Sequence, residues 1–142
     1  MGLTAGLRRT LMWVPVLLYR RSNGRIGGSI RGVSVLLLTV IGRKTGLPHT
    51  VPVSYFERDG AYLVVGSGGG SATEPQWFRN LRKASQADVQ LGARTLTVSV
   101  RIADEAERAA LWRDVIVATA PFFAPYEHKS GRTVPIAVLR PR

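Results

Sequence analysis

The feature that most constrains this fold is an apolar run without the polar alternation of a surface strand. Residues 33–41 read VSVLLLTVI. Near-continuous aliphatic and β-branched residues predict a strand that is buried on both faces. The segment from Gly42 to Gly46 (GRKTG) then turns the chain, and residues 49–57 predict the partner strand. The sequence therefore predicts a hairpin with two cations, Arg43 and Lys44, at its tip.

Further short elements follow this hairpin. Asp59-Gly60 is a hairpin signal. Beyond the first hairpin we expect strands at residues 61–66, 86–91, 94–103 and 134–139, and helices at 3–21, 74–84 and 105–119. Residues 22–32 form a Gly-rich connector, and residues 120–132 form an aromatic, Pro-containing loop or short helix. Six antiparallel-type strands with helices between them predict an α+β protein built on a small closed or half-closed barrel. We expect a single domain over residues 1–142.

Local signals set the expected helix ends. Pro15 should kink or restart the first helix. Thr73 and Gln76 have the spacing of a capping box, as do Asp104 and Glu107. In the helix over 105–119, the apolar spacing directs three side chains inward. These are Leu111, Val115 and Ile116.

Charge is concentrated at the N-terminal end of the chain. The net charge is +11, and residues 1–56 carry eight Lys and Arg side chains with no acid. Such a basic segment attracts nucleic acid, an anionic membrane or a polyanionic small molecule, although a solvated basic face without a partner is the alternative. The apolar stretch Leu11–Tyr19 is too short to span a bilayer, and no cleavage site follows it, so we expect a cytoplasmic protein. The amphipathic residues 1–32 either dock on a membrane surface or cover the barrel.

Two glycine-bracketed segments are candidate binding sites. The GRKTG turn lacks the spacing and the following helix of a nucleotide-binding P-loop. Its cations, hydroxyl and amides could form an anion nest, and a plain solvated turn is the other interpretation. The Gly-rich run at residues 66–70 precedes a helix. It either lets the backbone approach a flat ligand or an anion closely, or forms a flexible connection out of the preceding hairpin. His49 and His128 are too few for a metal site, and the chain has no Cys. Five aromatic residues line a pocket or pack in the core: Trp77, Phe78, Phe122, Phe123 and Tyr126.

Taken in order, these segments resemble a known family. The runs YRRSNGRIGG, LLLTVIGRKTGLPHTVPVSYF, GSGGG, PQWFRNL and VPIAVL are similar to those of the deazaflavin-dependent nitroreductases of actinobacteria, over about residues 19–141. The resemblance implies a split β-barrel fold, with residues 33–142 as the cofactor-binding core. It also implies binding of coenzyme F-420, an 8-hydroxy-5-deazaflavin that is flat at one end and polyanionic at the other.

The family pattern assigns roles to residues of this chain. It implies that the phosphate is received by Arg43, Lys44 and Thr45, with His49 near the oligoglutamate tail. The ring would be flanked by Pro52, Val53, Ser54, Val65, Gly66, Ser67, Gly68, Gln76, Trp77 and Asn80. Phe122, Phe123 and Tyr126 would form the substrate pocket, with Ser67 or Tyr126 orienting the substrate. Two positions depart from the family: Gly68 replaces a common Lys, and a Phe-rich run replaces a Tyr-rich substrate segment.

The implied activity is hydride transfer from the reduced deazaflavin to a quinone, an activated enone or a nitroaromatic. In such enzymes the cofactor performs the chemistry and the protein orients it. We expect no metal and no nucleic-acid partner, and possible membrane contact is confined to the N-terminal segment. Two alternatives stay open: a non-catalytic carrier of the same cofactor, and an FMN-binding split-barrel oxidoreductase.

Overall fold

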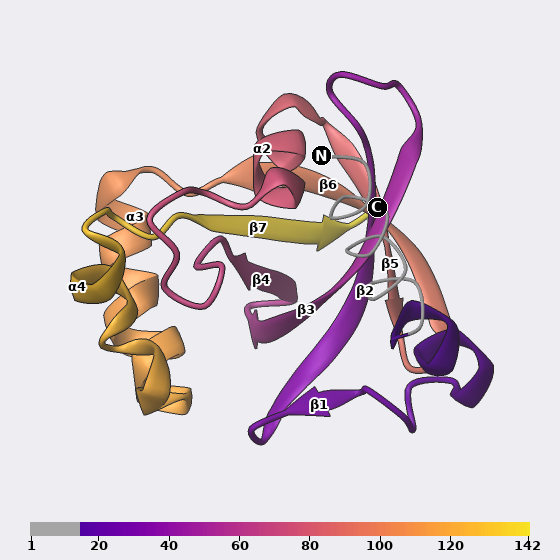
Figure 1. Cartoon of the computed structure of the whole chain (residues 1–142), viewed down its shortest axis with the longest axis horizontal. Helices are drawn as coiled ribbons and strands as arrows, with labels where there is room; N and C mark the ends of the chain where they lie inside the picture. The colour runs from indigo at the N-terminus through magenta and orange to yellow at the C-terminus, as the bar shows by residue number, and fades with distance from the viewer. Residues whose placement is uncertain (1–14) are drawn as a thin grey trace, which may run out of the picture.

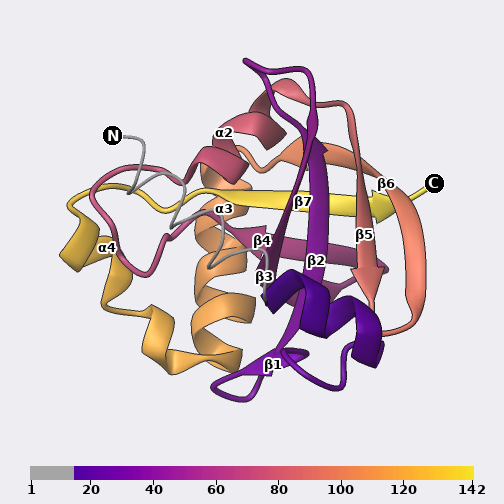
Figure 2. The same ribbon diagram turned by 45° about the vertical axis from the view of Figure 1, so that its right-hand side comes forward.

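Six antiparallel strands close into a barrel (Figures 1 and 2). The computed structural model describes residues 15–142. Around the barrel the strands follow the order β2 (Val33–Ile41), β3 (Pro48–Arg58), β4 (Ala61–Val65), β7 (Ile136–Pro141), β6 (Arg94–Ile102) and β5 (Gln86–Leu91). Pairing of β5 with β2 completes the closure. The α+β class and the six-stranded split barrel expected from the sequence are thus confirmed.

Strand β2 is mostly apolar because both of its faces are covered over its central residues. Leu36 and Leu38 point into the barrel interior. There they belong to the central core cluster, which consists of Leu36, Leu38, Val40, Val53, Val64, Phe78, Leu81, Ala87, Val89, Val98, Ala137 and Leu139. Their neighbours Val35 and Leu37 point outward and pack against Val16 and Tyr19, which belong to the helix over residues 15–22. The predicted double burial of this strand is confirmed.

A buried tyrosine provides most of the hydrogen bonds that hold that helix on the barrel. The Tyr19 hydroxyl donates to the carbonyl oxygens of Val35 (2.9 Å) and Gln90 (3.1 Å), and it accepts from the amide of Gly92 (2.9 Å). Tyr19 is only 1% exposed, so these bonds are shielded from water. The part of the predicted helix before residue 15 lies outside the described residues. No helix within 15–142 is long and apolar enough to cross a membrane.

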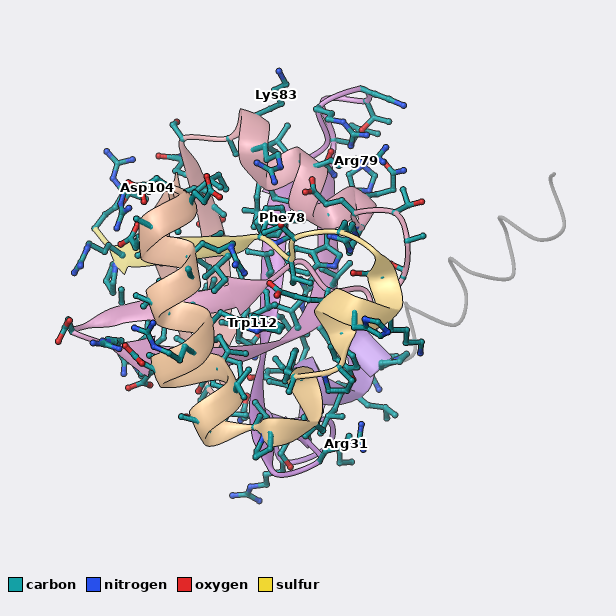
Figure 3. The ribbon with its side chains drawn as sticks, turned by 90° about the vertical axis from the view of Figure 1, so that its left-hand side faces the viewer. Arg31, Phe78, Arg79, Lys83, Asp104 and Trp112 are labelled. Atoms are coloured by element: carbon teal, nitrogen blue, oxygen red, sulfur yellow. The ribbon has the colours of Figure 1, made fainter. Side chains whose placement is uncertain are left out.

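Helix α2 (Gln76–Lys83) lies beside the tip of the β2–β3 hairpin in Figure 1. Phe78 and Leu81, both 0% exposed, belong to the central core cluster and so join this helix to the barrel interior. Figure 3 shows Phe78 beneath the helix and Lys83 extending from its end. Because its buried side chains are anchored in the barrel interior, the helix has a fixed position beside the hairpin tip.

A second group of helices covers the outer face of β3, β4 and β7. It comprises α3 (Glu105–Leu111), the π-helical turn η1 (Trp112–Val117), the 3-10 turn η2 (Pro121–Phe123) and α4 (Tyr126–Ser130). Asp104 caps α3 as predicted, since its carboxylate accepts the amide of Glu107 at 2.8 Å. The three residues predicted to face inward are buried. Trp112 is buried with them, since it lies three and four residues before Val115 and Ile116 and so shares their face of the helix.

Three local predictions differ from the structure. The Gly-rich connector contains a two-residue strand, β1 (Ser29–Ile30), that pairs with the start of β2. Thr73 does not cap α2: Pro75 occupies the N-cap position and no side chain caps it, while the Thr73 carbonyl is bonded by Ser71 and Arg132. The last strand begins two residues later than predicted and extends through Pro141.

Candidate functional site

A groove of about 270 Å³ lies between the β2–β3 hairpin tip and α2. It brings together residues that are far apart in the sequence but were predicted to bind one cofactor. Its lining consists of Gly42, Arg43, Lys44, Thr45, His49, Val51, Gln76, Trp77 and Asn80. Val51 was not predicted to line it, although the two-residue period of a strand places it on the same face as His49.

Arg43 joins the two walls of the groove. Its guanidinium donates to Asn80 Oδ1 at 2.6 Å and to Gln76 Oε1 at 2.7 Å. Its backbone amide also donates to Asn80 Oδ1, at 3.1 Å. Asn80 is 8% exposed, so the helix presents a fixed acceptor to the hairpin. A guanidinium has five N–H donors, and only two of them are used by these amide oxygens, which leaves others for a ligand.

The turn itself is organised by side chains that bond within it. Thr45 Oγ1 lies 3.0 Å from His49 Nε2 and accepts the amide of Leu47 at 3.2 Å. A methyl group on Gly42 would lie 2.6 Å from both of those side-chain atoms, so only glycine permits this packing. Lys44 is exposed and makes no ion pair or side-chain hydrogen bond within residues 15–142.

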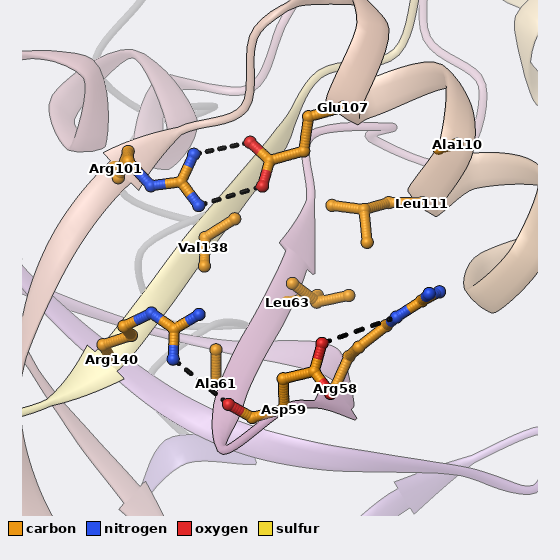
Figure 4. Close-up of a pocket in the computed structure, with 10 residues that line it drawn as sticks. All are labelled: Arg58, Asp59, Ala61, Leu63, Arg101, Glu107, Ala110, Leu111, Val138 and Arg140. Atoms are coloured by element: carbon orange, nitrogen blue, oxygen red, sulfur yellow. Dashed lines mark hydrogen bonds and ion pairs between the residues drawn. The ribbon is translucent and has the colours of Figure 1, made fainter.

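Positive charge in the groove has no acidic counterpart, because none of its lining residues is Asp or Glu. A second hollow, of about 250 Å³, provides the contrast (Figure 4). There Arg101 donates to both carboxylate oxygens of Glu107, and this guanidinium holds the pKa of Glu107 below its usual value. Arg58 lies 3.9 Å from Asp59. The cations of the second hollow are largely used within the fold, whereas those of the groove remain available to an anion.

The predicted ring-binding residues of β3 divide between two faces. His49, Val51 and Val53 pair with Val40, Leu38 and Leu36 and share their face. Pro52 and Ser54 alternate with them and pair with Leu37 and Val35. The side chains of Pro52 and Ser54 therefore lie on the face opposite the groove.

The Gly-rich loop after β4 packs closely on the protein. A methyl group on Gly66 would lie 2.8 Å from Phe78 Cδ2, and Ser67 is 7% exposed. Arg132 bonds four carbonyl groups of this segment. Arg132 was not among the predicted residues, because nothing near it in the chain indicates a contact some sixty residues away.

The predicted substrate residues lie in a separate cluster, on η2 and at the start of α4, that packs against η1. Phe123 is 6% exposed and packs against Phe56, Trp112 and Tyr126. Phe122 is half-buried and stacks under the guanidinium of Arg31, 4.3 Å from its ring centroid. Tyr126 borders the Gly-rich loop, since a methyl group on Gly70 would lie 3.4 Å from Tyr126 Cδ1. Of these three residues, Tyr126 is the one in contact with a predicted cofactor-binding loop.

Comparison with known proteins identifies the family. The model of the F420H(2)-dependent quinone reductase family matches residues 11–141. An F420H(2)-dependent quinone reductase of Mycobacterium tuberculosis is 33% identical over 128 residues, which cover 88% of this chain and 86% of that protein.

Solved structures agree with this match. An F420-H2-dependent reductase superposes with a TM-score of 0.66 at 30% identity, covering 75% of this chain and 93% of that one. A structure described as a domain-swapped dimer gives a TM-score of 0.67 at 29% identity, with 89% and 99% covered. The haem storage protein HutZ of Vibrio cholerae, at 18% identity and a TM-score of 0.54, shares the fold alone.

These matches confirm the family resemblance seen in the sequence. They also confirm the expected class of enzyme, an oxidoreductase that depends on the deazaflavin coenzyme. The chain belongs to the F420H(2)-dependent quinone reductase family.

Proposed function

We propose that the chain transfers hydride from reduced coenzyme F-420 to a quinone, with the groove at the hairpin tip as the socket for the cofactor's phosphate. The observation that carries this proposal is the pairing of Arg43 and Lys44 in a groove that no acidic residue lines. A phosphate binds best where cationic donors have no competing carboxylate. Family membership supplies the identity of the ligand.

The groove residues fit a ligand that is anionic at one end and flat at the other. Arg43 is held by Asn80 and Gln76, so its remaining donors are fixed before the ligand arrives. Lys44 adds an exposed second charge. Trp77 and Val51 provide an apolar wall beside these charges. Preorganised donors of this kind lower the entropic cost of binding.

Hydride chemistry belongs to the reduced deazaflavin when it is bound. The chain's own contribution is to orient the donor and the acceptor, which accounts for a large part of catalysis in reactions of two bound partners. Ser67 and Tyr126 flank the Gly-rich loop, Ser67 as part of it and Tyr126 by contact with Gly70. We assign them the task of hydrogen-bonding the accepting oxygen. Solvent supplies the proton.

Reduced cofactor mixed with menadione tests the activity. We expect the protein to oxidise the reduced cofactor faster than the protein-free mixture does, and a Lys44→Glu variant to lose most of this rate. Oxidation at the protein-free rate, with the cofactor bound, would instead indicate a carrier. An activated enone and a nitroaromatic tested in the same assay establish which acceptor is preferred.

A contact with the membrane surface is the second part of the proposal. Leu18, Ile26 and Ile30 are 42–54% exposed, and Arg20, Arg21 and Arg25 lie on the same short stretch of chain. Exposed apolar side chains beside cations favour an anionic bilayer. Sedimentation with vesicles that contain phosphatidylserine should exceed sedimentation with phosphatidylcholine vesicles. Equal recovery in both would refute this contact.

A further inference from the structure

One arginine outside the groove braces the Gly-rich loop. Arg132 lies between α4 and β7, and Figure 1 shows this connection running beside the loop that leads from β4 to α2. Its Nε donates to the carbonyl of Ser71 at 3.1 Å. One terminal nitrogen of the same guanidinium donates to Gly66 (2.9 Å), Ser67 (3.2 Å) and Thr73 (3.4 Å). A single side chain thus bonds both ends of the loop.

These bonds determine where the loop's amide groups point. In a planar trans peptide the C=O and the following N–H point in opposite directions. Because Arg132 holds the carbonyls of Gly66 and Ser67, the amides of Ser67 and Gly68 face away from it. Neither of these two amides donates a hydrogen bond to any group within residues 15–142. The loop therefore presents two neighbouring N–H donors on the side opposite the arginine.

The loop's own sequence does not impose this arrangement. Gly68, Gly69 and Gly70 all have positive φ, at 57°, 68° and 87°. Glycine reaches these angles readily, but it also reaches many others, so a run of glycines has a large conformational entropy. The Gly70 and Ser71 amides donate to the Ser67 carbonyl within the loop, at 3.0 and 3.2 Å. Arg132 adds bonds from outside the loop, and it is the group that joins the Gly66 and Ser67 carbonyls to those of Ser71 and Thr73.

Arg132 is itself held in place. The buried Ser130 hydroxyl donates to the Arg132 carbonyl (3.1 Å) and accepts the Arg132 amide (3.3 Å). Gly131 turns the chain with φ of 69°. Lys129 adds a second cation, with Nζ 3.4 Å from the Gly69 carbonyl. Neither cation forms an ion pair within the described part of the chain, although the charge of Arg132 helps to hold the pKa of the Glu74 carboxyl below its usual value, after the larger effect of Arg82. The loop therefore lies against two positive charges although residue 68 is glycine.

We infer that Arg132 is a positioning residue for the reaction: it directs the Ser67 and Gly68 amides at an oxygen of the bound deazaflavin ring. This inference rests on the proposed function. Amide donors that are fixed in advance stabilise negative charge on such an oxygen without reorganisation. The cations behind the loop polarise the same peptides and replace the charge that a lysine at position 68 would bring.

Hydrogen exchange and cofactor titration test the inference together. Arg132→Gln removes the fork and the charge, whereas Arg132→Lys keeps the charge but does not span four carbonyls. Arg140→Gln is the matched control, because Arg140 also extends from the β7 region and donates to a single turn carbonyl, that of Asp59. The first measurement is amide exchange at residues 66–73 in the ligand-free protein, and the second is fluorescence titration with oxidised coenzyme.

We expect Arg132→Gln to accelerate exchange in this loop at least about tenfold and to weaken coenzyme affinity by roughly tenfold, in line with the loss of a preorganised donor set. Arg132→Lys should show a smaller change in both, and Arg140→Gln none. In the wild type, the Ser67 and Gly68 amide resonances should shift downfield on coenzyme binding. Wild-type exchange in Arg132→Gln, or full rescue by lysine, would overturn the positioning role. Faster exchange with unchanged affinity would overturn the link to the ring. A wild-type protein that binds no coenzyme would instead refute the proposed function. The exchange comparison would still show whether Arg132 holds the loop in place.

Discussion

Substitution of the two cations at the hairpin tip should have different effects on stability, because only one of them forms hydrogen bonds within the fold. Arg43 donates to Asn80 and Gln76 of α2, whereas Lys44 is exposed and bonds no side chain within residues 15–142. Arg43→Gln and Lys44→Gln therefore remove one charge each, but only the first also removes a link between two elements.

The magnitudes follow from the contacts. Loss of a charge-assisted phosphate contact costs about 1.5–3 kcal/mol, which weakens coenzyme affinity roughly 10- to 150-fold in either variant. In Arg43→Gln the Asn80 oxygen keeps the backbone amide at 3.1 Å, so no buried acceptor is left without a partner. The stability cost is then about 1–2 kcal/mol, or a fall in Tm of roughly 3–6 °C. Lys44→Gln should leave Tm within about 1–2 °C of the wild type.

Thermal melts and coenzyme titrations on the same preparations provide the comparison. Arg94→Gln, a substitution at an exposed strand end remote in sequence from the groove, is the control for loss of one positive charge. Equal melting temperatures for the two groove variants would refute the bracing role of Arg43. Unchanged affinity in both would refute the phosphate socket.

Three further predictions concern stability. The Arg82 guanidinium holds the pKa of the Glu74 carboxyl below its usual value. This pair therefore stabilises the fold above the unfolded-state pKa, and its contribution is lost as pH falls through the lowered pKa of the folded state. Glu74→Gln should cost about 0.5–1 kcal/mol of unfolding free energy at pH 7 and nothing in strong acid, which thermal melts across pH will test. Gly66→Ala places a methyl group 2.8 Å from Phe78 and should lower the free energy of unfolding by about 1–3 kcal/mol in urea titration. Tyr19→Phe removes a hydroxyl with three backbone partners and should cost about 1–3 kcal/mol by the same measurement; a loss below about 0.5 kcal/mol would show that the helix over 15–22 is not fixed by this group.

Much of the barrel could be predicted because the local sequence pattern matches the burial that each strand has in the folded protein. The apolar run of β2 reflects two covered faces, and Asp59-Gly60 marks a hairpin that forms between β3 and β4. Periodicity also places the inward residues of α3 and η1. The failure at Thr73 has a physical reason: the chain before α2 is held by bonds from Ser71 and Arg132, so the local capping signal does not decide the helix start.

The candidate site was predictable in part. Resemblance to a family identified the cations of the turn and the amides of α2, and the structure brings these into one groove. The alternation of β3 would have separated Val53 from Pro52 and Ser54, had it been applied to the predicted ring contacts. Arg132 was beyond sequence reasoning, since its four carbonyl partners are defined only by tertiary packing.

The central claim is that this chain holds a deazaflavin coenzyme by a phosphate socket at the tip of the hairpin. Titration with oxidised coenzyme F-420, followed by its fluorescence, tests this most directly. We predict saturable binding at micromolar protein that weakens in Lys44→Gln and persists in Arg94→Gln. No binding by the wild-type protein at micromolar concentration would contradict the account.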